Sequence, residues 1–238
     1  MDRTTRVFDN TTGAIDPPDS IPWGQQSEHQ REGKRITTMS SCDWGFTFEA
    51  MRVYHDTEWG VPVHDDRIMF EHLMMEAMQC GLSWSLMLKK REIFRACFDG
   101  FDYDRIADYT DADIDRIMNT EGMIRSPRKI EAVINNARCF RKVRKEHGSF
   151  CDWLWAHTDG KTVLYMGHEN GKIPVSNGLS DEIAKELKAY GFKYLGTVTV
   201  YSHLQACGIV NDHGKDCPCY RQINEHNPTV RKRRYLEK

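Results

Sequence analysis

The chain has 238 residues, which is enough for one substantial hydrophobic core or for a core with a smaller lobe. No apolar run is long enough to cross a bilayer, and the N-terminal residues lack the apolar segment of a secretory signal. We therefore expect a soluble intracellular protein whose eight cysteines are reduced thiols, some of them metal ligands, and no disulfide framework. The formal net charge of −2 excludes a global electrostatic case for nucleic-acid binding, so any DNA-binding surface must be local.

Composition divides the chain into three parts. Residues 1–38 are polar, rich in turn-forming residues and without periodicity, which predicts a flexible leader. Residues 39–220 carry the helical patterns of a folded domain, and residues 221–238 are expected to form a charged, solvated tail.

Helical spacing of apolar residues dominates the domain, and strand signals are few, so the predicted class is all-α. A short helix followed by a turn is expected within 48–66, and Asp65 or Asp66 is a candidate N-cap for the helix that follows. The remaining expected elements are a helix in 85–101, two tightly joined helices in 111–148, a short helix around 153–155, a loop at 167–171, a helix from Ser180 to Gly191, and a last helix from Thr197 to Cys207.

The central helix contains an acidic residue in an apolar setting. The stretch Phe70–Trp84 repeats apolar residues at helical spacing, and Glu76 lies between Met75 and Ala77. An ionised carboxylate buried without a partner is costly, so Glu76 should have either a partner or a task. A solvent-facing Glu76 is the alternative. Gly81 is a candidate stop for this helix.

A set of cysteine and histidine residues suggests a metal site. His213 and Cys217 are four residues apart, and Cys42 and His55 lie near the start of the predicted domain. Together they form a Cys2His2 set suited to zinc, and four protein ligands would leave no position for an activated water. The metal would then be structural and would tie the two ends of the domain together. Cys219 could replace one of these ligands. The alternative without a metal is that the cysteines are ordinary buried residues and the histidines lie on the surface.

The two helices of 111–148 have a strong junction signal. Ser126 is a candidate N-cap and Pro127 a candidate first helical residue. Such a hairpin, over about 113–143, could present backbone amides to a DNA phosphate, with Arg125, Arg128 and Lys129 adding positive charge. A plain helical hairpin with a solvated basic face is the alternative.

Six sequence blocks, in order and in register, resemble the 3-methyladenine DNA glycosylase I family. The resemblance extends from about Ser41 to Tyr220, which is most of the chain. The blocks are Cys42–Trp44, Tyr54–Pro62, Gly81–Trp84, Leu88–Glu92, Gly122–Arg125 and Gln205–His213.

The resemblance implies an all-helical helix-hairpin-helix glycosylase in which a structural zinc site joins the N- and C-terminal segments. The positions that it assigns are the zinc ligands Cys42, His55, His213 and Cys217, the base-recognition and catalytic carboxylate Glu76, the base-binding aromatics Trp44, Tyr54 and Trp84, the DNA-wedging turn Gly81 and Leu82, and the DNA-binding hairpin from Gly122 to Lys129.

The implied activity is hydrolytic removal of 3-methyladenine from alkylated duplex DNA, with no strand cleavage. The wider superfamily usually has a catalytic aspartate shortly after the hairpin, whereas here none follows Lys129 before Asp152. Met51 stands where the family has a further pocket tyrosine, and the leader and most of the tail have no family counterpart.

The resemblance further implies a cytoplasmic monomer that acts at the nucleoid, with DNA and the released base as its partners. Two alternatives are a zinc-stabilised module that binds DNA without chemistry and a zinc-dependent hydrolase.

Overall fold

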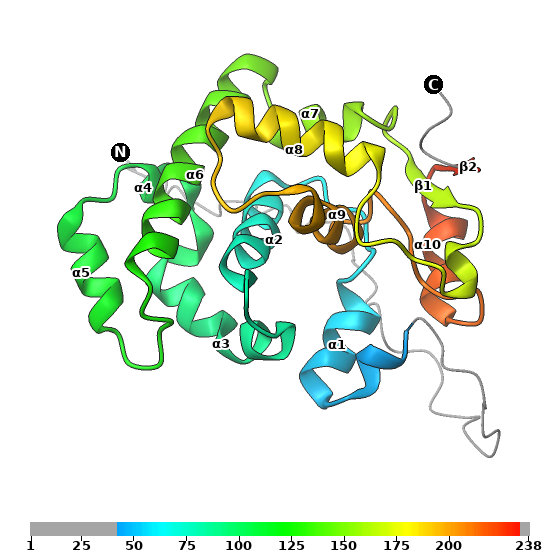
Figure 1. Cartoon of the computed structure of the whole chain (residues 1–238), viewed down its shortest axis with the longest axis horizontal. Coiled ribbons are helices and arrows are strands. Elements are labelled where there is room, and N and C mark those ends of the chain that lie inside the picture. The colour runs from blue at the N-terminus through cyan, green and yellow to red at the C-terminus, as the bar shows by residue number, and fades with distance from the viewer. Residues whose placement is uncertain (1–41, 234–238) are drawn as a thin grey trace, which may run out of the picture. The chain divides into compact units, whose positions relative to one another are not determined.

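Helices form most of residues 42–233, the part of the chain that the computed structural model describes (Figure 1). All of these residues belong to one structural unit, Gly33–Lys238. In chain order the elements are η1 (Asp43–Phe46), α1 (Glu49–Thr57), α2 (Asp66–Gln79), α3 (Trp84–Cys97), η2 (Asp99–Phe101), α4 (Tyr103–Ala107), α5 (Asp111–Asn119), α6 (Pro127–His147), α7 (Phe150–Ala156), β1 (Thr162–Tyr165), η3 (His168–Asn170), α8 (Gly178–Tyr190), α9 (Thr197–Ala206), α10 (Pro218–His226) and β2 (Thr229–Lys232), where η denotes a 3-10 helix.

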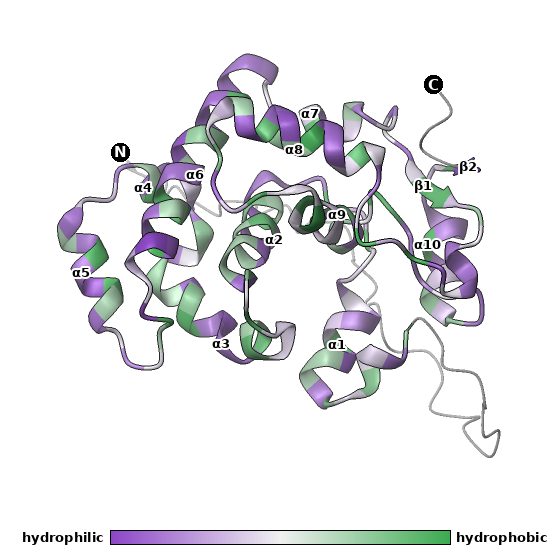
Figure 2. Ribbon diagram, in the orientation of Figure 1, coloured by the Kyte–Doolittle hydropathy of each residue, from purple (hydrophilic) through white to green (hydrophobic). Residues whose placement is uncertain are grey.

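Helix α2 is central and packs against α3, α6, α7 and α9. Its predicted start is confirmed, because the Asp65 side chain accepts hydrogen bonds from the amides of Arg67 and Ile68. Apolar residues predominate in α9, whereas outer helices such as α5 and α8 alternate between hydrophilic and apolar residues (Figure 2). Phe140 of α6 joins the surrounding helices at the core, with ring centroids 5.1 Å from Phe70 and 4.2 Å from Phe150.

Helices α5 and α6 form the predicted hairpin, and they pack against each other. Ser126 is the N-cap of α6 and Pro127 its first residue, as the sequence indicates. A capping box between Thr110 and Asp113 starts α5, so both helices begin at defined residues. The turn between them, residues 120–126, begins at Thr120, whose amide donates to the Ile117 carbonyl, and ends at the N-cap Ser126.

Two helical boundaries differ from the predictions. Helix α8 begins at Gly178, because Asn177 caps it and Ser180 completes a capping box from the third helical position. The helix α9, predicted as the last one, is followed by α10, which starts at Pro218. The boundary expected at residue 220 therefore falls inside a helix.

The all-α expectation needs one correction, because the described part also contains a small parallel sheet. Strand β1 pairs with β2 in the register Thr162↔Thr229 to Tyr165↔Lys232. All four residues of β1 are buried, so the strand lacks the alternating pattern that would have revealed it. Strand β2 lies within the segment expected to be a tail.

Within the described residues, no helix combines the length and the apolar character needed to span a membrane. The leader predicted over 1–38 lies outside the described residues.

Candidate functional site

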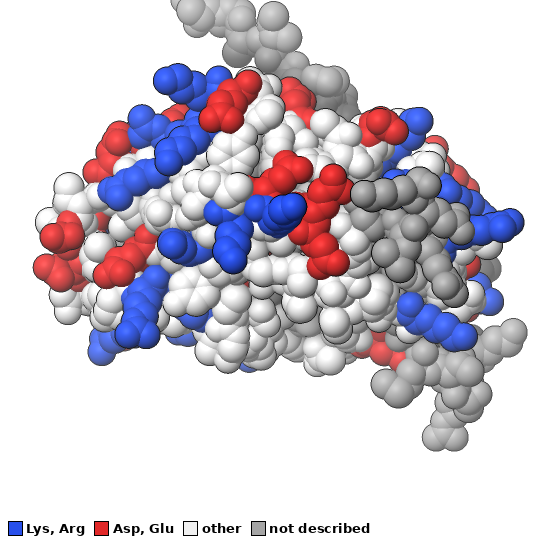
Figure 3. Space-filling view, turned by 45° about the horizontal axis from the view of Figure 1, so that its top comes forward, with Lys and Arg blue, Asp and Glu red and all other residues white. Residues whose placement is uncertain are grey.

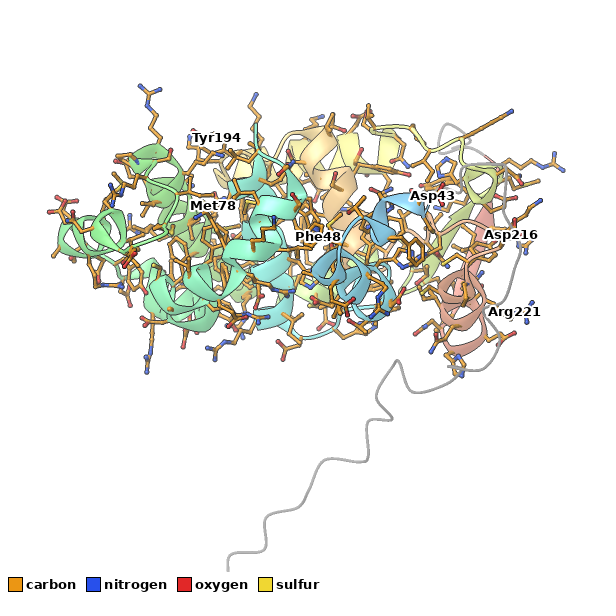
Figure 4. All side chains as sticks on the ribbon, turned by 90° about the horizontal axis from the view of Figure 1, so that it is seen from below. Asp43, Phe48, Met78, Tyr194, Asp216 and Arg221 are labelled. Carbon is orange, nitrogen blue, oxygen red and sulfur yellow. The ribbon has the colours of Figure 1, made fainter. Side chains whose placement is uncertain are left out.

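The four proposed metal ligands meet at one point, although they come from opposite ends of the described chain. Cys42 precedes η1, His55 lies on α1, and His213 and Cys217 lie just before α10. All four are buried, and their ligand atoms lie within 4.8 Å of one another. Figure 4 shows Asp43 and Asp216, the sequence neighbours of two ligands, at the same end of the view.

The distances fit a tetrahedral ion. Cys42 Sγ and Cys217 Sγ are each 3.5 Å from His213 Nδ1, and Cys217 Sγ is 3.7 Å from His55 Nε2. Tetrahedral zinc with Zn–S of about 2.3 Å and Zn–N of about 2.0 Å separates sulfur from nitrogen by roughly 3.5 Å. The donor set and its spacing therefore suit zinc.

Hydrogen bonds fix both imidazoles for metal binding. His55 Nδ1 donates to the Asp56 carboxylate at 2.7 Å, and His213 Nε2 donates to the Trp59 carbonyl at 2.9 Å. The nitrogen that faces the cluster is therefore the unprotonated one in each ring. The Gly214 amide also donates to Cys42 Sγ at 3.4 Å, which favours a thiolate there. Asp56 and Trp59 were not singled out from the sequence, although both belong to the block Tyr54–Pro62.

Cys219, the alternative ligand, is half-buried and belongs to a second group with His55 and Asp56. It lies outside the buried set of four. Residue 45 has to be a glycine, because a Cβ atom there would come within 2.7 Å of the His55 ring and clash with it. None of the eight cysteines, all of which lie in the described part, forms a disulfide.

Glu76 is buried on α2 without a partner. Its exposed fraction is 6%. Among residues 42–233, no group forms a hydrogen bond or ion pair with its carboxyl group. Burial alone raises the pKa of Glu76 to about 8. A lone buried carboxyl group with a shifted pKa is typical of a functional site.

A group of aromatic rings includes Tyr54, a residue close enough to Glu76 for the two to interact electrostatically. The ring of Tyr54 lies 5.3 Å from Trp84 and 6.3 Å from Trp44, measured between centroids. Burial, followed by the negative charge of Glu76, raises the pKa of Tyr54 well above its usual value. Trp84 Nε1 is buried and has no hydrogen-bond partner in the described structure. The Trp84 N–H donor and the Glu76 carboxyl acceptor are therefore both available to hydrogen-bond a ligand.

Helix α1 connects this aromatic set to the cluster of two cysteines and two histidines. Tyr54 and His55 are consecutive, and the Trp44 ring lies 5.4 Å from the His55 ring. Met51 is buried one turn earlier on the same helix. A metal that holds η1 and α1 in place would therefore also position the aromatic rings.

The turn expected to wedge into DNA follows α2 directly. Gly81 has φ +79°, a conformation that favours glycine, and it is exposed. Leu82 is half-buried and packs against the main core. Lys129 Nζ donates to the carbonyls of Met78 and Cys80, each at 2.7 Å, and so holds this turn against α6.

The hairpin residues differ in whether they are exposed to an approaching ligand. Gly122, Arg125 and Arg128 are exposed, and the carbonyl of Gly122 accepts a hydrogen bond from the Lys90 ammonium group. Lys129 is committed to the turn after α2. Basic and acidic side chains are interspersed on the face shown in Figure 3, so no single basic surface covers it.

Comparison with known proteins gives the family. The sequence pattern of the methyladenine glycosylase family matches residues 44–221. The chain belongs to this family. It is 40% identical over 182 residues to DNA-3-methyladenine glycosylase 1 of Escherichia coli K12, a match that covers 76% of this chain and 97% of that protein. It is 37% identical to DNA-3-methyladenine glycosylase of Haemophilus influenzae, over 75% of this chain and 96% of that protein.

Solved structures of methyladenine glycosylases share the fold. A crystal structure of 3-methyladenine DNA glycosylase I matches with a TM-score of 0.71 and 45% identity, covering 75% of this chain and 98% of that one. A structure on 3-methyladenine recognition by the Staphylococcus aureus enzyme matches with a TM-score of 0.71 and 37% identity, covering 75% and 95%. The family match ends at residue 221, so β2 lies outside the matched region.

Proposed function

We propose that this protein is a monofunctional DNA glycosylase that releases 3-methyladenine from alkylated duplex DNA. The observation that carries the proposal is the buried, unpartnered carboxyl group of Glu76 beside Tyr54. A module that only binds DNA has no need of such a pocket, and a buried carboxyl group without a ligand is costly to keep.

Base recognition follows from the side chains available. The damaged base must leave the helical stack, which costs a few kcal/mol and less for a damaged base. Leu82 would occupy the vacated space, and Trp44, Tyr54 and Trp84 would contact the flipped ring. A methylated, electron-poor ring is attracted to such aromatic faces. Glu76 would accept a hydrogen bond from the amino group of the adenine.

The positive charge of the methylated base would distinguish it from undamaged adenine. In the nucleotide, 3-methyladenine is cationic, and an opposite charge nearby lowers a carboxyl pKa. The cationic base would therefore favour ionised Glu76, whereas undamaged adenine offers no such gain. Methylation also makes the base a good leaving group. The C1′–N9 bond breaks with its electron pair going to N9, water bonds to C1′, and the water's proton is released to solvent.

The hairpin of α5 and α6 is proposed as a helix-hairpin-helix that anchors a DNA phosphate. Gly122 would offer its exposed backbone, and Arg125 and Arg128 would offer positive charge. Lys129 would act on DNA through the turn that it holds.

We also propose that Cys42, His55, His213 and Cys217 bind a structural zinc ion. Four protein ligands close the coordination sphere, so the ion would stabilise the fold and take no part in bond cleavage. A monomer acting on chromosomal DNA in the cytoplasm, at the nucleoid, completes the proposal. Its catalytic domain would begin near residue 39 and extend through β2, because α10 continues past residue 220 and β2 pairs with β1.

Binding of free 3-methyladenine, followed by tryptophan fluorescence, tests the pocket directly. We expect saturable binding by the wild-type protein, weak or no binding of adenine, and affinity reduced at least tenfold in Glu76→Gln. Full affinity in Glu76→Gln would contradict the assigned role.

A further inference from the structure

An open groove lies beside the turn that follows α2. It has a volume of about 530 Å³ and is formed by the first turns of α6 and by residues 191–196, here termed the groove loop. The lining residues are Arg128, Glu131, Ala132, Asn135, Lys193 and Tyr194. The groove adjoins the proposed wedge, because Cys80 Sγ lies 3.6 Å from the Tyr194 carbonyl oxygen.

The groove loop is held rigidly on α6. Asn136 is fully buried, and its side-chain amide donates to the Lys193 carbonyl at 3.0 Å and accepts from the Lys193 amide at 2.7 Å. Asn135 adds a hydrogen bond of 2.8 Å to the Gly191 carbonyl. These contacts satisfy the loop's backbone and fix where its side chains emerge.

Tyr194 has an unusual backbone conformation. Its φ is +59°, which is uncommon for a large side chain and costs about 1–3 kcal/mol. The residue nevertheless remains 40% exposed. Figure 4 shows Tyr194 at the edge of the view, beyond Met78 of α2. Packing alone does not explain a strained backbone at a large residue that stays partly exposed, whereas presentation of its side chain to a ligand does.

The charges of the groove favour an anion. Arg128 and Lys193 are exposed, and within the described part neither side chain forms an ion pair or hydrogen bond. Glu131 is the one carboxylate among the lining residues. A second groove lies at the other end of α6, and there the arginines are already neutralised. Arg141 pairs with Asp108, and Arg144 pairs with Asp66.

We infer that this groove binds a backbone phosphate of duplex DNA next to the flipped nucleotide. Arg128 and Lys193 supply the charge, and the Tyr194 hydroxyl donates a hydrogen bond to a phosphate oxygen. The inference rests on the proposed function, because the wedge turn brings the DNA strand to this edge. The groove then acts as an anchor in addition to the hairpin turn, and Arg128 contributes charge to both.

Affinity for a duplex that carries an uncleavable abasic analogue tests the inference, measured over a series of salt concentrations. Lys193→Met should weaken binding several-fold and reduce the salt slope by about 0.9, the value for one lost phosphate contact. Tyr194→Phe, which keeps the ring and the backbone conformation, should weaken binding with little change in slope. Free 3-methyladenine should bind both variants as it binds wild type.

Lys142→Met is the matched control, because Lys142 lies on α6 in the second groove. It should retain the wild-type affinity and slope. If wild type releases 3-methyladenine but Lys193→Met keeps its affinity and slope, the groove inference is wrong and the proposed function stands. If wild type neither binds DNA nor releases base, both are wrong. Thermal unfolding of each variant excludes misfolding as the cause of weak binding.

Discussion

At the scale of single residues, Glu76 links stability to pH. Its pKa is raised to about 8 by burial, so the folded state binds an extra proton between pH 4.5 and 8. The free energy of unfolding should therefore fall as pH rises through this window, by up to ~1.4 kcal/mol per unit. Urea unfolding should show this contribution in wild type and its loss in Glu76→Gln. Equal pH dependence in both proteins would show that Glu76 is solvated.

Two buried histidines should make the free energy of unfolding rise with pH, opposite to the effect of Glu76. Burial lowers the pKa of His72 to about 4, and burial together with His72 lowers the pKa of His203 to about 3. Both nitrogens of His203 lack hydrogen-bond partners in the described structure. The unfolded chain takes up these protons below pH 6.5, so stability should fall as the solution is acidified, by up to ~1.4 kcal/mol per unit for each histidine.

His203→Phe separates this effect from that of Glu76. The variant should lose less stability than wild type between pH 6.5 and pH 5, as measured by urea unfolding. A variant as acid-sensitive as wild type would indicate that His203 is protonated in the folded protein.

At the scale of elements, Lys129 joins α6 to the C-terminal end of α2. Its ammonium group donates to two carbonyls there, an arrangement that also suits the negative end of the helix dipole. Lys129→Met should speed amide exchange in residues 78–82 and slow single-turnover excision, with little change in free-base affinity. Lys129→Arg should restore part of the rate. Weaker DNA binding with unchanged amide exchange would instead make Lys129 a phosphate ligand.

Long periodic helices with clear caps could be predicted from the sequence. Helices α2 and α6 carry their own signals in Asp65 and in Ser126 with Pro127. By contrast, β1 is four residues long and its partner β2 follows far later in the chain, so no local pattern reveals either strand.

The site could be predicted only in part. Metal ligands and aromatics are chemically distinctive, and the structure brings the four ligands together. Lys129 donates its hydrogen bonds to carbonyls some fifty residues away in the sequence. The exposed position of Tyr194 depends on the contact of Asn136 with the neighbouring Lys193 amide. Contacts between distant segments leave no periodic trace in the sequence.

At the scale of the whole molecule, the cluster of Cys42, His55, His213 and Cys217 joins the start of the described chain to the segment that leads into α10. Metal analysis should find one zinc per wild-type chain, and Cys217→Ser should lose it and be destabilised by several kcal/mol. Amide exchange should rise around residues 42–60 and 211–226 together. Cys219→Ser, the matched control, should keep the metal. Zinc loss that abolished excision in a fully folded protein would favour a catalytic metal.

Release of free base from methylated duplex DNA, with strand integrity followed in the same reaction, is the most direct measurement of function. We predict release of 3-methyladenine with an intact backbone, and no release from an undamaged duplex. Binding of methylated DNA without base release would contradict the proposed activity and would favour a non-catalytic DNA-binding module.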